Sequence, residues 1–159
     1  ARAIADQFRR DIHPEALAPY PNVDGVVALT HGAGCATASD GEPLQILRRT
    51  LGGYARHANF GALLMVGLGC ETNQISGLMA QEGLHESSRL QTFDIQDAGG
   101  TSKAVARGIE EVEWMLAEAN RVHREPVPAS EVWRPRSRSP GIQVTAESGT
   151  RSTSSLPTM

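Results

Sequence analysis

Two cysteines and a histidine stand beside glycines in short segments rich in small residues. His31 and Cys35 share the first segment, and Cys70 precedes Glu71 in the second. Thiolates and imidazole are ligands of iron and zinc, and neighbouring glycines let the backbone approach a metal ion closely. Cys is also often buried, so packing of both thiols is an alternative. Two thiolates do not complete a metal site, which needs about three or four protein ligands.

His31 leaves three roles open: metal ligand, general acid or base, or polar loop residue. A third segment contains Gln96 and then Gly99-Gly100-Thr101 at the start of a predicted helix. Free backbone N–H groups at such a helix start favour a carboxylate or phosphate, although a tight turn with a helix cap has the same sequence. The segments lack a Gly-x-Gly-x-x-Gly or Walker pattern, so nothing specific points to a nucleotide.

Each segment follows a predicted strand. Residues 25–30 and 61–68 are short apolar runs typical of a buried strand, and residues 89–95 show an alternating pattern. Apolar residues at helical spacing predict helices over about 1–12, 42–56 and 101–119, and a further helix that contains Ile75, Leu78 and Met79. Because parallel strands need a crossover between them, we expect an α/β fold, a three-layer Rossmann-like parallel sheet with helices on both faces. The carboxyl ends of its strands would bring all three segments to one edge.

Composition bounds the rest of the chain. A formal net charge of -3 over 159 residues argues against a broad nucleic-acid or anionic-membrane surface. No apolar run approaches the roughly 20 residues that span a bilayer. We expect an α/β domain at residues 1–132 and a disordered tail at 133–159, which is rich in Ser, Thr, Pro and Gly. Two cysteines make a poor disulfide framework, which favours a reduced, cytoplasmic setting.

The motifs taken together are more specific than any one of them. The chain contains, in order, residues 22–35 (NVDGVVALTHGAGC), 67–75 (GLGCETNQI), 95–101 (IQDAGGT) and 119–121 (ANR) ahead of 124–128 (REPVP). In this order they resemble the altronate/galactarate dehydratase family. Ala36 departs from the pattern, since family members often have Gly there.

The resemblance implies a metal-dependent hydro-lyase that removes water from a small sugar acid and gives a 2-keto-3-deoxy acid. It implies Fe²⁺ as cofactor, with an iron cluster or another divalent metal as alternatives. Family members are longer, so the chain resembles their central part and would need an N-terminal SAF-type domain and a C-terminal region as partners. An isolated segment of this kind is expected to be inactive, and homo-oligomerisation is left open.

Carried over residue by residue, the resemblance implies three sets of site residues. Cys35 and Cys70 would hold the metal, and His31 and Glu71 would be catalytic. Side chains or backbone groups that would bind the substrate are those of Asn73, Gln74, Gln96, Gly99, Gly100 and Thr101. One alternative is a noncatalytic substrate-binding or assembly module of a larger lyase. Another is a sulfo-lyase acting on a related hydroxy acid.

Overall fold

Two parallel strands form the centre of the fold. The computed structural model describes residues 1–33, 38–123 and 125–128, and the fold is that of the unit Ala1–Arg124. Strand β1 (Leu63–Gly67) pairs with β2 (Leu90–Asp94), and helix α3 (Ile75–Glu82) crosses between them. In this register Leu63 is the partner of Leu90 and Gly67 is the partner of Asp94, so the carboxyl ends of both strands coincide. The predicted strand–helix–strand crossover is confirmed.

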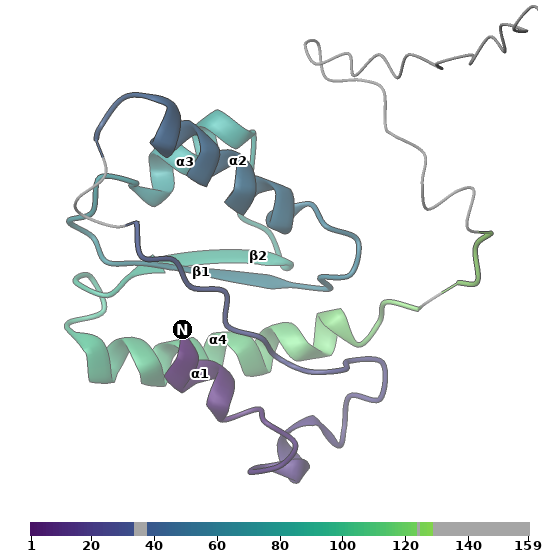
Figure 1. Cartoon of the computed structure of the whole chain (residues 1–159). Helices are drawn as coiled ribbons and strands as arrows, with labels where there is room; N and C mark the ends of the chain where they lie inside the picture. Colours follow the sequence, from purple (N-terminus) through teal and green to yellow (C-terminus); the bar gives the residue numbers. More distant parts are fainter. Residues whose placement is uncertain (34–37, 124, 129–159) are drawn as a thin grey trace, which may run out of the picture. The chain divides into compact units, whose positions relative to one another are not determined.

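Helices cover both faces of this sheet (Figure 1). Helices α2 (Glu42–Ala55) and α3 lie on one side, and α1 (Arg2–Asp6) and α4 (Thr101–Ala119) lie on the other. The strands alternate accordingly, because successive side chains of a strand point to opposite faces. Phe93 faces α4, where the guanidinium of Arg107 stands 4.7 Å from its ring centroid. Helices α2 and α4 begin at Glu42 and Thr101, where the sequence predicts them.

The main core lies between α1, a 3₁₀ helix (Pro14–Leu17), α4 and the sheet. Its buried centre consists of Ile4, Phe8, Leu17 and Leu116. Packed against this centre are the partly buried side chains of Ala16, Tyr20, Val23, Val26, Val66, Val105, Ile109 and Val112. The apolar side chains at helical spacing in α4 thus pack against the N-terminal segment, so the core joins residues from opposite ends of the domain sequence.

Polar bonds join α2 to α3 on the opposite face. Arg56 forms an ion pair of 2.7 Å with Glu82, whose side chain is 8 % exposed. The Glu82 carboxylate fits because Gly52 has no side chain, since a Cβ there would lie 2.5 Å from Glu82 Oε2. Nearer the start of α2, Gln45 Oε1 accepts a hydrogen bond of 2.7 Å from Gln81 Nε2. These bonds cross the helix pair at more than one level and hold α3 against α2.

The expected first helix is too long. Helix α1 ends at Asp6, and the following N–H groups bond three residues back, Phe8 to Ala5 and Arg9 to Asp6. This tighter pattern is the 3₁₀ type, which ends regular α-helix. Phe8 is buried as the spacing predicts, but Ile12 is 51 % exposed.

The expected strand at 25–30 is also absent. The structure describes these residues, and they belong to no strand, because none of their backbone groups pairs with another strand. The described residues therefore contain a parallel sheet of two strands, which supports an α/β class but does not confirm a three-layer Rossmann-like fold. The predicted tail at 133–159 lies outside the described residues.

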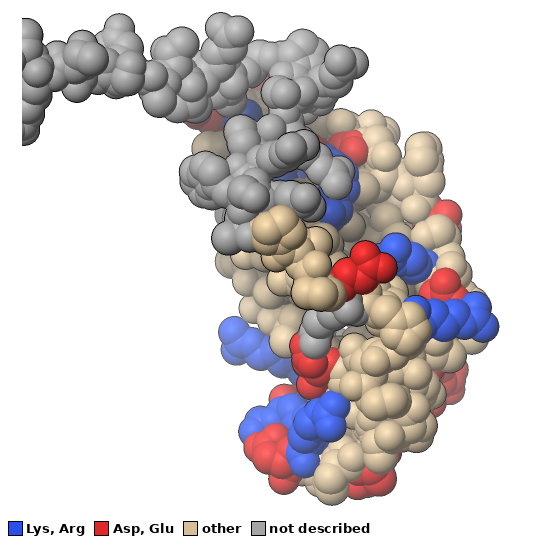
Figure 2. Space-filling model, turned by 90° about the vertical axis from the view of Figure 1, so that its right-hand side faces the viewer, with Lys and Arg blue, Asp and Glu red and all other residues tan. Residues whose placement is uncertain are grey.

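The surface carries charges of both signs. On the face shown in Figure 2, basic and acidic side chains are interspersed rather than gathered by sign. Several are paired, as Arg121 is with Glu118 at 2.9 Å. Within the part of the chain that the structure describes, no helix combines the length and apolar character needed to cross a membrane.

Two neighbouring aliphatic residues of α2 test the packing. Leu44 is 2 % exposed and Ile46 is 50 % exposed. We expect Leu44→Ala to lower the free energy of unfolding by about 2–5 kcal/mol, because it leaves a cavity, and the matched control Ile46→Ala to change it by less than about 0.5 kcal/mol. Urea unfolding followed by circular dichroism measures both. Equal losses would show that α2 does not pack through Leu44.

Candidate functional site at the carboxyl ends of the strands

Two carboxylates meet over the last residue of β1. A Cβ placed on Gly67 would lie 2.9 Å from Glu71 Oε1 and closer still to Asp94 Oδ1. Glu71 is held there because its Oε1 also accepts the N–H of Leu68 at 2.9 Å. Asp94 comes from the end of β2 and pairs with Gly67 in the register. Glycine at 67 thus lets side chains from two loops occupy the space over one Cα.

The loops after β1 and β2 remain joined beyond the sheet. Ile95 N–H donates to Gly67 O at 2.9 Å, and Gln96 N–H donates to Leu68 O at 3.3 Å. The side chain of Gln96 lies over Gly69, where a Cβ would be 2.9 Å from Gln96 Oε1. Gly69 also has a φ of +104°, a conformation that residues with side chains rarely adopt. Two of the three predicted segments therefore come together as expected.

Helix α2 anchors the first of these loops through Arg48. Asn73 is 5 % exposed, and its Oδ1 accepts a hydrogen bond of 2.9 Å from Arg48 Nε. Arg48 reaches it across Gly77, where a Cβ would lie 2.7 Å from Arg48 Nη2. Gln74 closes the loop by donating to the backbone oxygen of Gly69 at 3.2 Å. Asn73 and Gln74 are both predicted to bind substrate. In this structure Asn73 Oδ1 and Gln74 Nε2 are instead engaged in hydrogen bonds within the protein.

The start of α4 is open to an anion. Gly99 and Gly100 have φ of +82° and +108°, and the helix that follows has 19 residues without a side-chain cap. Among the described residues, no hydrogen-bond partner meets the N–H groups of Thr101, Ser102 and Lys103. A Cβ on Gly99 would lie 3.4 Å from Lys103 Nζ. Free N–H groups, the helix dipole and an ammonium group all favour a carboxylate or phosphate here.

The first predicted segment is less closely attached. His31 is exposed, and in Figure 1 residues 31–33 come to the same end of the sheet as the two loops. No hydrogen bond joins His31 to either loop within the described chain. Cys70 is an exposed free thiol, and Cys35 lies outside the described residues. The proposed sharing of a metal by these cysteines therefore stays a prediction.

A metal site is not complete in the described part of the chain. Its residues contain no group of three or more His, Cys, Asp or Glu placed to hold a metal ion. Cys70 and the two carboxylates are chemically suited donors, but a catalytic site needs about three protein ligands around one position. Further donors would have to come from residues other than those that the structure describes.

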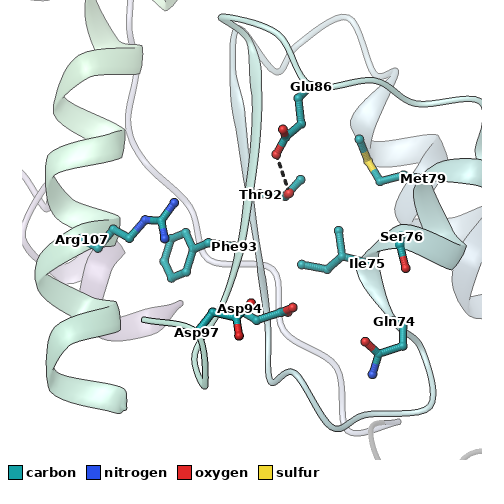
Figure 3. A pocket seen from close by; sticks show the side chains of 10 residues that line it. All are labelled: Gln74, Ile75, Ser76, Met79, Glu86, Thr92, Phe93, Asp94, Asp97 and Arg107. Atoms are coloured by element: carbon teal, nitrogen blue, oxygen red, sulfur yellow. Dashed lines mark hydrogen bonds between the residues drawn. The ribbon is translucent and has the colours of Figure 1, made fainter. Parts of the chain in front are cut away.

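A hollow of about 440 Å³ adjoins the strand ends (Figure 3). Its lining comes from both faces of β2, which places it along the edge of β2 that faces away from β1. In Figure 3 Phe93 and Arg107 lie toward α4, while Thr92 bonds Glu86 on the other side, at 2.6 Å. The remaining lining residues are Gln74, Ile75, Ser76, Met79, Asp94 and Asp97. Gln74 and Asp94 belong to the strand-end site, so the hollow adjoins it.

Sequence reasoning missed Asp94 and Lys103. Asp94 was detectable, because the last residue of a predicted parallel strand lies at the same edge as the loop after it. Lys103 is the only lysine of the chain and follows Gly99-Gly100 within one helical turn. Both residues stand beside groups that the sequence analysis already singled out.

Comparison with known proteins identifies the family of this chain. The sequence model of the second domain of D-galactarate dehydratase/altronate hydrolase matches residues 1–120. The chain belongs to this family. Among curated proteins, altronate dehydratase of Escherichia coli (strain K12) is 30 % identical over 133 residues, which cover 83 % of this chain and 25 % of that enzyme. The chain thus spans about a quarter of this relative, and no solved structure matches it.

Neighbouring arginines test the anchoring of the loop after β1. Arg48→Met leaves the buried Asn73 without its donor, which should lower the free energy of unfolding by about 1–3 kcal/mol. Arg49→Met is the matched control, because Arg49 bonds only an exposed carbonyl of its own helix. Hydrogen exchange of residues 68–74 should accelerate in the first variant alone. Unchanged exchange in Arg48→Met would remove Arg48 as the anchor of this loop.

Proposed function

We propose that the chain is a second-domain segment of a sugar-acid hydro-lyase, which dehydrates altronate or galactarate to a 2-keto-3-deoxy acid. The observation that carries this proposal is the convergence of the loops after β1 and β2 in a chain of the dehydratase family. The convergence brings carboxylates and a helix start with free N–H groups to one edge of the sheet. Such groups can transfer protons and stabilise negative charge in the elimination of water from a hydroxy acid.

The reaction assigns a task to each group. A base takes the proton from the carbon next to the substrate carboxylate, and an acid protonates the hydroxyl on the following carbon, which leaves as water. The resulting enol becomes the 2-keto-3-deoxy acid by taking up a proton on the carbon that lost its hydroxyl and releasing the enol O–H proton. Glu71 and Asp94 are the proposed proton-transfer pair, with His31 as a further acid or base. Both carboxylates stand over Gly67, so one is proposed to act as the base and the other as the acid.

The start of α4 is proposed to bind the substrate carboxylate. The N–H groups of 101–103 and the ammonium of Lys103 would stabilise negative charge there, and more so as it grows in the enediolate. Gln96, whose side chain lies over Gly69, is proposed to bind a substrate hydroxyl. Gly99 and Gly100 act through their backbone conformation, since side chains at positive φ would strain this turn.

Fe²⁺ is the proposed cofactor, with Cys35 and Cys70 as ligands and the remaining donors from another part of the enzyme. The family resemblance supports this assignment, and the suitable chemistry of Cys70 agrees with it. A bound metal would act as a Lewis acid toward substrate oxygens. Because part of the metal site would lie elsewhere, we also propose that an N-terminal SAF-type domain and a C-terminal region complete the enzyme. The Rossmann-like sheet is part of the same proposal.

A second candidate is a noncatalytic module that binds substrate or assembles with other domains. Two observations support this candidate. The described residues hold an incomplete set of metal donors, and the chain covers 25 % of its relative. The two candidates differ in whether chemistry depends on Glu71 and Asp94.

Carboxylate variants separate these candidates in a hybrid enzyme, in which this chain replaces the matching quarter of E. coli altronate dehydratase. Glu71→Gln or Asp94→Asn should lower kcat for altronate by about 10²–10⁴, because proton transfer is lost while shape is retained. Glu110→Gln, on the exposed face of α4, is the matched control. If both site variants keep full turnover, the catalytic proposal fails and the module remains.

Lys103 tests substrate binding separately. Lys103→Gln in the hybrid enzyme should raise KM about tenfold, with a smaller change in kcat, because the ammonium acts mainly on a charge that the substrate already carries. Ser102→Ala is the control on the same turn. Lys103 is the only lysine that this chain contributes to the hybrid, so peptide mass spectrometry identifies its reductive methylation, which a bound substrate should slow. Methylation at the same rate with and without saturating altronate would contradict this role.

A further inference from the structure

The segment 26–30 presents apolar side chains on two opposite sides. Val26 packs against the core cluster, whereas its neighbour Val27 is 65 % exposed and Leu29 is 46 % exposed. This alternation is that of an extended strand with one side on the core. The other side, which we call the outer face of 26–30, is also apolar. A run that is apolar on both sides is typical of a strand covered on both faces.

The backbone of this segment is unpaired as well. From Gly25 to Ala33, no backbone N–H or C=O group bonds to any described residue. One weak side-chain bond holds it, from Arg2 Nη2 to Thr30 Oγ1 at 3.4 Å. The chain thus has an extended stretch with free hydrogen-bonding groups and a free apolar face. Such a stretch is a template for the addition of another strand.

We propose that the outer face of 26–30 is covered by the remaining part of a dehydratase of this family, a strand of which pairs with the segment. The proposal rests on the proposed function, since the partner is the rest of that enzyme. Two findings point to this occupant rather than to another: the matching family model is that of a second domain, and the chain covers only 25 % of its relative. Three quarters of such an enzyme is therefore available to cover the face.

The pairing has a consequence for the site. His31 directly follows the segment, and residues 31–33 lie at the same end of the sheet as the strand-end loops (Figure 1). A strand partner would fix the direction of 26–30 and thereby the position of His31. The partner thus completes the site by ordering a residue of this chain, as well as by any residue of its own.

Hydrogen exchange measured by mass spectrometry tests the proposal. In this chain alone, amides 26–30 should exchange at close to the rate of an unfolded peptide, because they have no partner. In intact E. coli altronate dehydratase, the matching amides should exchange about 100-fold or more slowly. The matched control is β1, residues 63–67, which should be protected in both proteins because it pairs with β2.

Three results would overturn the proposal. Fast exchange in the intact enzyme would show that no strand covers the segment there. Protection in the chain alone that grows with protein concentration would identify a second copy as the occupant. Protection in the chain alone at every concentration would mean that the chain covers the segment itself. Exchange does not depend on turnover, so a hybrid enzyme that is inactive but protected would refute the proposed function and support this interface.

Discussion

The parallel pairing of β1 with β2 is the constraint on which the site depends. Because the two strands end in register at Gly67 and Asp94, the loops that follow begin side by side. Gly67 then decides what can stand over the strand ends, since any side chain there would displace the carboxylates of Glu71 and Asp94. A sheet of two strands is small, but its pairing suffices to bring together polar groups from distant parts of the sequence.

The helices hold this arrangement by different means on the two faces. On one face, α4 packs through apolar side chains against the N-terminal segment. This packing orients the helix, whose free N–H groups lie at the candidate site. On the other face, α2 and α3 are joined by polar bonds at glycines, where Arg48 crosses Gly77 and Glu82 stands over Gly52. The apolar core stabilises the fold, and the polar contacts set the position of the loop after β1.

Much of the fold and part of the site could be predicted from the sequence. The strands at 63–67 and 90–94 and helices α2, α3 and α4 follow from apolar periodicity, a local property. The meeting of the loops around Glu71 and Gln96 follows from the rule that parallel strands end at one edge. The strand predicted at 25–30 is wrong. Its residues favour an extended backbone, but a strand also needs a partner, and the described chain offers none.

The sequence by itself determined the family, strands β1 and β2, helices α2, α3 and α4, and the segments that follow the two strands, because residue types and their spacing are local information. Only the tertiary structure decided which groups meet. It placed Asp94 beside Glu71 and Lys103 beside Gly99, and it engaged Asn73 with Arg48 instead of leaving it open. The physical reason is that these contacts join residues far apart in the chain, or depend on a missing Cβ, and both are settled by packing rather than by local preference.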